Sequence, residues 1–197
     1  MNINPIDYSS TPPPTQRTGS GCLSFVIDVL ETLVLSLILF VVINAVSARI
    51  RVDGSSMEPT LHSGEFVIVN KLAYKFSTPA LGDIIVFHFP RDPKQEYIKR
   101  VIGMPGDQVT IQNGKVYVNG QEIIEPYISA SPVYPNNSWQ VPAGQLFVLG
   151  DNRNNSSDSH NWGTVPLDYV VGKALFVYWP LDSWGTIEHI STASAAP

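Results

Sequence analysis

Residues 97–107 read YIKRVIGMPGD, a run of β-branched and aromatic side chains that ends in a turn rich in Gly and Pro. Successive side chains of a strand point to opposite faces, so Tyr97, Lys99 and Val101 share one face and the residues between them share the other. The stretch therefore predicts a strand that places a lysine among apolar neighbours. It also sets the fold class, because similar short runs recur along the chain.

The runs that resemble this strand are short, and Pro and Gly separate them. Asn113-Gly114 joins two of them, and this dipeptide supplies the positive φ angles of a tight type I′ hairpin. No long stretch has a 3.6-residue apolar period, so we expect a mostly β, antiparallel domain over about residues 49–191. The expected strands are Phe66–Val69, Ile84–Phe89, Tyr97–Ile102, Val109–Ile111, Val116–Val118, Leu146–Leu149 and Val170–Trp179.

The segment 22–48 is almost wholly apolar and carries no charge from Thr32 onward. A bilayer core of about 30 Å needs roughly 20 apolar residues, so we expect one N-terminal transmembrane helix over residues 22–48. Asp28 and Glu31 share one face of that helix. They either reach the headgroup region or become neutral, and the alternative is a buried functional pair.

A cleavable signal peptide is the main alternative for this segment, because Val46-Ser47-Ala48 resembles a cleavage site. Signal peptides usually have an apolar core of about 7 to 15 residues after a basic region. Here the apolar stretch is longer, and only Arg17 is basic before it, so we favour a retained anchor. Arg49, Arg51, Lys71 and Lys75, on the far side, oppose the positive-inside rule.

Composition excludes several classes of function. The net charge of −5 and the pI near 5.2 give no field that attracts nucleic acid. The chain has one cysteine, Cys22, and its four histidines form none of the short metal-ligand spacings, so we expect no metal and no cofactor. The Pro- and Ser-rich residues 1–21 predict a disordered tail, and residues 192–197 a flexible one.

The cluster GSSMEPTL at residues 54–61 is rich in turn residues, and it contains a serine pair. A serine hydroxyl is a weak nucleophile that needs a base. Lys99 could supply it, because burial disfavours the ammonium form and lowers the pKa of a lysine. The alternative is a solvated lysine at a sheet edge.

A polar loop follows an expected strand at residues 150–163, with the sequence GDNRNNSSDSHNWG. Its side chains either face water or form a hydrogen-bonded network. A calcium loop is a rival interpretation, since Asp151, Asn155 and Asp158 offer oxygen ligands. The spacing does not match an EF-hand, which has ligands at alternate positions and a terminal Glu.

Four clusters in this order resemble the type I signal peptidases, a family of serine proteases with a Ser/Lys dyad: residues 52–61, residues 82–87, residues 97–107 and the polar loop. The resemblance implies that Ser56, which precedes Met57, is the nucleophile and that Lys99 is its general base. It implies further that the Ser156 hydroxyl orients the lysine. Supporting roles are expected for Asp158, Arg100 and Asp151.

The resemblance also implies removal of N-terminal signal peptides from exported preproteins, with cleavage after Ala-X-Ala-like small residues. The chain is similar to compact, single-anchor members such as those of cyanobacteria and chloroplasts. The expected location is a plasma or thylakoid membrane, with a cytoplasmic tail, the catalytic domain on the trans side and an export translocase nearby. The expected substrate-binding residues are Ile50, Val52, Met57, Leu61, Tyr97 and Ile98.

Two positions depart from the pattern of some relatives. Gly54 stands where some bacterial members have a serine that helps to bind the oxyanion, so we expect the Ser56 N–H and the region of Gly54 to form the oxyanion hole. His160 stands where several members have arginine. An ion pair between His160 and Asp158 would be weaker and would depend on pH.

Two rival functions stay open from the sequence. A self-cleaving repressor-type Ser/Lys protease would need a DNA-binding module, and the tail before Cys22 is short and poor in basic residues. A membrane-anchored β module that binds exported chains without cutting them is the rival from another class. We also expect slow cleavage of one molecule by another between Ala48 and Arg49, because the anchor resembles the enzyme's own substrate.

Overall fold

A computed structural model describes residues 21–189, in which residues up to 42 and residues from 43 onward form two separate units. The first is most of helix α1 (Gly21–Val46), whose 26 residues would extend about 39 Å. It is apolar and long enough to cross a membrane. The helix ends two residues earlier than expected, because Ser47 and Ala48 already pair with β2. The expected tails lie outside the described residues, except Gly21, which begins α1.

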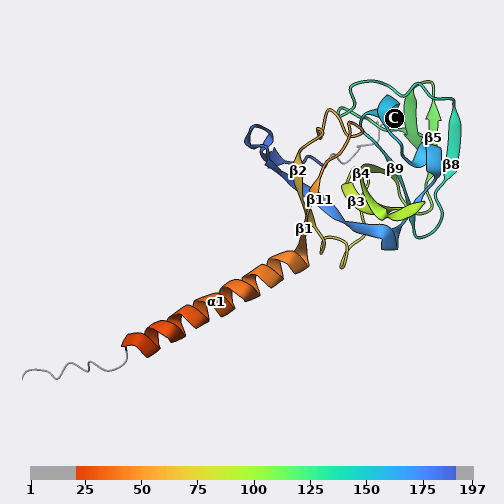
Figure 1. The fold of residues 1–197 in the computed structure, drawn as a ribbon. Helices are drawn as coiled ribbons and strands as arrows, with labels where there is room; N and C mark the ends of the chain where they lie inside the picture. Colours follow the sequence, from red (N-terminus) through yellow and green to blue (C-terminus); the bar gives the residue numbers. More distant parts are fainter. Residues whose placement is uncertain (1–20, 190–197) are drawn as a thin grey trace, which may run out of the picture. The chain divides into compact units, whose positions relative to one another are not determined.

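The unit that begins at residue 43 contains two antiparallel sheets (Figure 1). The larger sheet has the strand order β1-β2-β11-β3-β4-β9-β10, with β12 also paired to β11, and the smaller has the order β7-β6-β5-β8. All seven expected strands are present, so the mostly β, antiparallel fold is confirmed. The strands are β1 (Ser47–Arg51), β2 (Phe66–Asn70), β3 (Ile84–Phe89), β4 (Asp92–Gly103), β5 (Gln108–Gln112), β6 (Lys115–Val118), β7 (Gln121–Glu122), β8 (Asn137–Gln140), β9 (Gln145–Leu149), β10 (Val165–Pro166), β11 (Val170–Trp179) and β12 (Gly185–Thr186), with a short helix α2 (Ser159–Trp162) and 3-10 turns at Arg153–Asn155, Leu167–Tyr169 and Leu181–Ser183.

Strand β3 is buried on both faces, which explains its continuous apolar sequence. Ile84 and Val86 belong to one apolar cluster, whereas Ile85 and Phe87 belong to another on the opposite face. Its neighbour β4 follows the same alternation, because Lys99 lies opposite Ile85 in the antiparallel register. The predicted placement of the lysine among apolar side chains is therefore confirmed.

The smaller sheet begins with the predicted hairpin. Asn113 and Gly114 have φ angles of 53° and 75°, and Gln112 pairs with Lys115 across them. These angles are those of a type I′ turn. A second turn with positive φ at Asn119 and Gly120 connects β6 to β7, and the sequence analysis did not identify it.

The strand directions position the site. Four antiparallel pairings separate β1 from β4 along the sheet, so the two strands run in the same direction. β1 pairs only with β2, and β4 pairs with β9 only from Arg100 onward. Within the described residues, β1 and the part of β4 before Arg100 thus each have one edge without a strand partner. Such edges can accept an added strand.

Candidate active site

Ser56 lies in the loop of residues 52–65, which connects β1 to β2. The backbone closes the loop at its base, where Val52 N–H donates to the Glu65 carbonyl at 2.8 Å and Gly64 N–H donates to the Val52 carbonyl at 2.8 Å. Met57 and Leu61 are fully buried in the core, and Leu61 N–H donates to the Met57 carbonyl. The apolar residues after the serine therefore anchor the turn that presents it.

Lys99 on β4 meets this serine. Its Nζ donates a hydrogen bond to Ser56 Oγ at 2.7 Å and a second one to the Ile98 carbonyl at 3.0 Å. The Tyr97 ring centroid lies 5.5 Å from Nζ. Only 4% of the lysine is exposed, so its amine is held against the serine hydroxyl and shielded from water.

The electrostatics of this pair favour a base. Burial lowers the pKa of Lys99 from 10.5 to about 8, although the carboxylates of Asp158 and Asp151 partly oppose that change. About a tenth of the lysine is then neutral at pH 7, and a neutral amine can accept the proton of Ser56 Oγ. The geometry and the pKa together describe a nucleophile with an adjacent base.

The polar loop holds the serine turn from the other side. Asn152 N–H donates to the Ser56 carbonyl at 3.1 Å, and Asn152 Nδ2 donates to the Ser55 carbonyl at 3.0 Å. Asn155 Nδ2 donates to Ser55 Oγ at 2.7 Å. These contacts lie nearly 100 residues apart in sequence. No sequence pattern predicted these roles for Asn152 and Asn155, and the only signal for them was their place in a polar loop.

Gly150 permits this close approach. A Cβ atom at this position would collide with the Ser56 carbonyl oxygen and with Ser156 Oγ. Any side chain here would push the polar loop away from the serine turn, so only glycine allows the Asn152 contacts to form.

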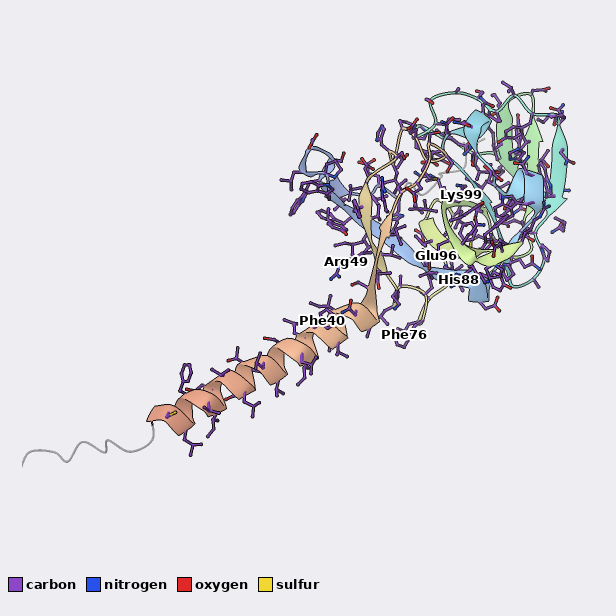
Figure 2. All side chains as sticks on the ribbon, viewed as in Figure 1. Phe40, Arg49, Phe76, His88, Glu96 and Lys99 are labelled. Atoms are coloured by element: carbon purple, nitrogen blue, oxygen red, sulfur yellow. The ribbon has the colours of Figure 1, made fainter. Side chains whose placement is uncertain are left out.

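A groove of about 630 Å³ opens beside the Ser56–Lys99 pair. Of the six expected substrate-binding residues, Ile50, Tyr97 and Ile98 line it. The other three are buried in the core, with Val52 2% exposed and Met57 and Leu61 fully buried; any contact of these three with substrate stays a prediction. Figure 2 marks Arg49, Glu96 and Lys99 among the lining residues. The lining residues that the sequence analysis did not predict for this groove are Arg49, Arg51, Asp53, Gln95, Glu96 and Ser157.

Comparisons with known proteins identify the family. The family described as "Signal peptidase, peptidase S26" matches residues 26–179. The chain belongs to the signal peptidase family. A probable signal peptidase I-1 of Synechocystis is 42% identical over 83% of this chain and 87% of its own, and a signal peptidase I of Leptolyngbya laminosa is 41% identical over 91% of this chain and 94% of its own. The thylakoidal processing peptidase 1 of Arabidopsis thaliana is 39% identical, over 66% of this chain and 41% of its own. The predicted similarity to cyanobacterial and chloroplast members is confirmed.

In this signal peptidase the residue after the lysine has a structural task. Arg100 Nε and Nη2 donate to the two oxygens of Asp151 at 2.9 and 2.7 Å, and its guanidinium carbon lies 3.9 Å from the centroid of the Tyr127 ring. Thr60 from the serine loop donates to the same carboxylate at 2.5 Å. The buried pair thereby joins β4, the polar loop and the serine loop.

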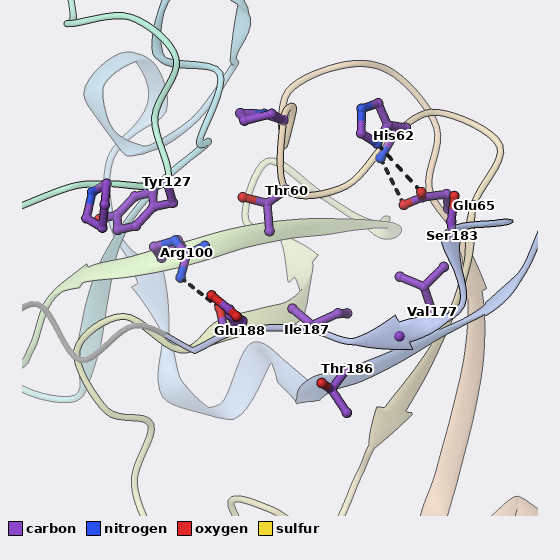
Figure 3. Close-up of a pocket in the computed structure, with 13 residues that line it drawn as sticks. Thr60, His62, Glu65, Arg100, Tyr127, Val177, Ser183, Thr186, Ile187 and Glu188 are labelled. Atoms are coloured by element: carbon purple, nitrogen blue, oxygen red, sulfur yellow. Dashed lines mark hydrogen bonds and ion pairs between the residues drawn. The ribbon is translucent and has the colours of Figure 1, made fainter.

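Arg100 also borders a second cavity of about 650 Å³, which contains neither Ser56 nor Lys99. Figure 3 shows this cavity and the bond of Arg100 to the chain at Glu188, where Nη1 donates to the backbone carbonyl at 3.4 Å. Nη1 also donates to the Gly82 carbonyl at 2.9 Å, so each of the three guanidinium nitrogens is bonded to a protein group.

Asp158 is a buried carboxylate of the polar loop whose charge acts on Lys99. It accepts from Gly150 N–H at 3.0 Å and contacts His160 Nδ1 at 2.6 Å. The His160 ring in turn stacks on Tyr134, with the ring centroids 4.0 Å apart. The structure therefore brings together His160 and Asp158. This is the pair expected from the sequence, in which His160 stands where several members of the family have arginine.

Ser156 and the turn at Gly54 are the remaining residues with an expected role in the site. Ser156 Oγ is buried and has no hydrogen-bond partner among residues 21–189, so its task of orienting Lys99 stays a prediction. Gly54 N–H donates to Ser63 Oγ at 3.2 Å, whereas Ser56 N–H makes no hydrogen bond within the described chain. This leaves the Ser56 N–H available to a substrate oxygen. Among the described residues, no three His, Cys, Asp or Glu side chains converge as metal ligands would.

Proposed function

We propose that this chain is a serine endopeptidase that removes N-terminal signal peptides from exported preproteins, cutting after Ala-X-Ala-like small residues. The observation that carries the proposal is the 2.7 Å contact between Lys99 Nζ and Ser56 Oγ beside an open groove. The membership of the signal peptidase family supports the same reaction.

The reaction is acyl transfer with one base. Neutral Lys99 takes the proton of Ser56 Oγ, and the oxygen attacks the carbonyl carbon of the scissile bond. The Ser56 N–H donates to the oxyanion, aided by the turn at Gly54. Lys99 then gives its proton to the leaving amine, and water, activated by the same lysine, hydrolyses the acyl-enzyme. Ser156 and Asp158 position the lysine, while Arg100 and Asp151 hold the loops together.

The substrate binds as an added strand between the free edges of β1 and β4. Both strands run toward the Ser56–Lys99 pair, so an extended chain can follow them to the reactive atoms. Ile50, Tyr97 and Ile98 narrow the groove. Bulky walls of this kind leave room for Ala and exclude larger side chains.

The membrane anchor sets where the reaction occurs. Strand β1 begins at the residue after α1, so only nine residues separate the end of the helix from Ser56. We place residues 1–21 in the cytoplasm and the catalytic domain, residues 49–191, on the trans side of a plasma or thylakoid membrane. A preprotein leaving an export translocase nearby would present its cleavage site at this level.

A cleavage assay tests the proposal. Full-length protein in detergent is incubated with a preprotein, and the new amino terminus of the product is sequenced. Ser56→Ala and Lys99→Ala should each lower kcat by on the order of a million-fold, because a nucleophile and its base act as one unit. Lys99→Arg should fail too, because a guanidinium stays protonated. Ser138→Ala, in the smaller sheet, is the matched control.

The assay also separates the rivals. Binding without cleavage by the unmodified protein would favour a binding module, and cleavage only of the chain itself would favour a self-processing protease. Turnover retained by Ser56→Ala would overturn the assignment of the nucleophile. EDTA should leave the rate unchanged, and activity lost to EDTA and restored by zinc would contradict the metal-free dyad.

A further inference from the structure

A cavity of about 370 Å³ lies at the carboxyl end of α1, within the unit that begins at residue 43. It contains neither Ser56 nor Lys99, and it opens between the last turn of the helix, the segment after β2 and the start of β11. Two of its lining residues are lysines and most of the others are apolar or aromatic. The lining residues are Ala45, Lys71, Tyr74, Lys75, Leu167, Val170 and Val171.

The first lysine is held against the helix end. Lys71 N–H donates to the Val46 carbonyl at 3.0 Å, and Lys71 Nζ lies 3.5 Å from the Asn44 carbonyl. A helix leaves its last carbonyls unpaired and carries a partial negative charge there, which attracts a cation. The contact therefore fixes the ammonium of Lys71 at the level of the last helical turn.

The second lysine has no counter-charge. Lys75 is exposed, and its side chain makes no hydrogen bond or ion pair within residues 21–189. No carboxylate lines the cavity. The nearby Asp83 is already engaged, because Lys173 Nζ donates to it at 2.6 Å and Tyr74 Oη at 2.8 Å. The cavity thus has a positive field and two ammonium groups with hydrogen-bonding capacity left for an anion.

The depth of the cavity follows from the anchor. α1 is an apolar helix of spanning length that ends at Val46, and Ala45 in its last turn lines the cavity. The cavity then lies where hydrocarbon gives way to headgroups. Phe76 follows Lys75 and is 92% exposed, and Figure 2 shows it at the outer end of this loop. Aromatic rings and lysines beside a helix end are typical of a membrane interface.

We propose that this cavity binds the headgroup of an anionic phospholipid in the leaflet next to the catalytic domain. The ammonium groups of Lys71 and Lys75 donate to the phosphate oxygens, and the acyl chains follow the apolar wall of Ala45 and Val171. Phe76 enters the interface beside the lipid. The site gives a local reason for lysines that oppose the positive-inside rule, and it does not depend on the proposed peptidase activity.

Native mass spectrometry tests the proposal on the full chain. The protein is reconstituted into phosphatidylcholine vesicles with or without phosphatidylglycerol, released into mild detergent and scored for retained lipid. Each lysine near an anionic surface contributes about fivefold in affinity, so Lys71→Gln combined with Lys75→Gln should reduce retained phosphatidylglycerol about 30-fold. Lys94→Gln combined with Lys115→Gln removes the same charge elsewhere and should retain the lipid.

Further arms keep the test decisive. Lys75→Gln alone breaks no contact of the folded chain, so it should still weaken binding about fivefold even if the double variant is unstable. Inorganic phosphate added to the released protein should displace little lipid, because it lacks the acyl chains. Three results would overturn the proposal: no preference for phosphatidylglycerol over phosphatidylcholine, equal retention by the two double variants, or full displacement by inorganic phosphate.

Discussion

Raising the pH from 7 to 8 should increase kcat/KM about fivefold, because a lysine with a pKa of about 8 passes from about a tenth neutral to about half neutral. kcat/KM is the informative constant, since it reports the free enzyme that the structure describes. The rate should then level off about one pH unit above the pKa. With its ordinary pKa of 10.5, the lysine would be about 300 times less neutral at pH 7.

The low pKa of Lys99 has a cost in stability. The difference between 10.5 and about 8 corresponds to about 3 kcal/mol for a group that is 4% exposed. The pKa of Lys99 is lower in the folded chain than in the unfolded chain. This difference makes the free energy of unfolding highest above pH 10.5, and the contribution is lost as the pH falls through about 8. Lys99→Met should therefore raise the melting temperature at pH 7 while abolishing cleavage.

The assays are a pH series of kcat/KM with a signal-peptide substrate and thermal unfolding followed by tryptophan fluorescence. The gain of Lys99→Met over the unmodified protein should shrink as the pH is raised toward 10.5. A rate that keeps rising up to about pH 10 would refute the reasoning, since it would mean that burial does not lower the pKa. A Lys99→Met variant that is less stable than the unmodified protein at pH 7 would refute it as well.

Three further changes test the surroundings of the dyad and the anchor. Asn152→Ala should lower kcat about tenfold with little change in KM, because one hydrogen bond to the serine turn is lost. Asn154→Ala is the control, because the side-chain amide of Asn154 bonds the segment at residues 131–133 instead. Equal losses of kcat in the two variants would contradict the role of Asn152 in holding the serine turn. His160→Arg should shift the acid limb of the rate profile to lower pH, because a permanent cation offsets the carboxylate that raises the pKa of Lys99, and an unchanged limb would remove this coupling. A sample stored in detergent should slowly accumulate a fragment that begins at residue 49, at a rate that rises with protein concentration. Self-cleavage would be disproved if mass spectrometry finds no such fragment, or finds as much of it in the Ala48→Phe variant as in the unmodified protein.

The structure makes self-cleavage a demanding event. Ala48 pairs with Val69, and Arg49 pairs with Ile68, so the bond between them lies within the ladder of β1 and β2. An attacking molecule would need this strand to peel away before it could enter a neighbour's groove. β1 is an edge strand, which makes such an opening easier than it would be in the centre of the sheet.

The sequence predicted most of the strands because strand formation depends largely on the side chains of a few neighbouring residues. The alternation around Lys99 and the turn at Asn113 and Gly114 each depend on a few neighbouring residues, and both have the expected geometry. Strand β1 was absent from the expected strands, and its start was not foreseen since Ser47 and Ala48 continue the apolar pattern of the helix. Short strands such as β7 and β10 were missed because two residues carry no period.

The candidate site likewise contains some residues that the sequence could indicate and others that it could not. The resemblance of four clusters to the signal peptidases implied Ser56 and Lys99, whereas residue type alone left an ordinary turn serine and a solvated lysine open. The amides of Asn152 that hold the serine turn had no such signature, since an asparagine in a polar loop looks the same whether it is solvated or bonded. The burial of Met57 and Leu61 beneath the groove likewise depends on how the loop packs.

The sequence by itself determined the apolar helix and the mostly β fold, because hydropathy and side-chain period are properties of short segments. Its resemblance to the signal peptidases implied that Ser56 and Lys99 are the reacting pair. Only the tertiary structure decided that Lys99 lies 2.7 Å from a serine 43 residues away and has a pKa of about 8. It alone also brought Lys71 and Lys75 to a cavity at the helix end. Contact and desolvation arise from packing between distant segments, and that packing is absent from any local stretch of chain.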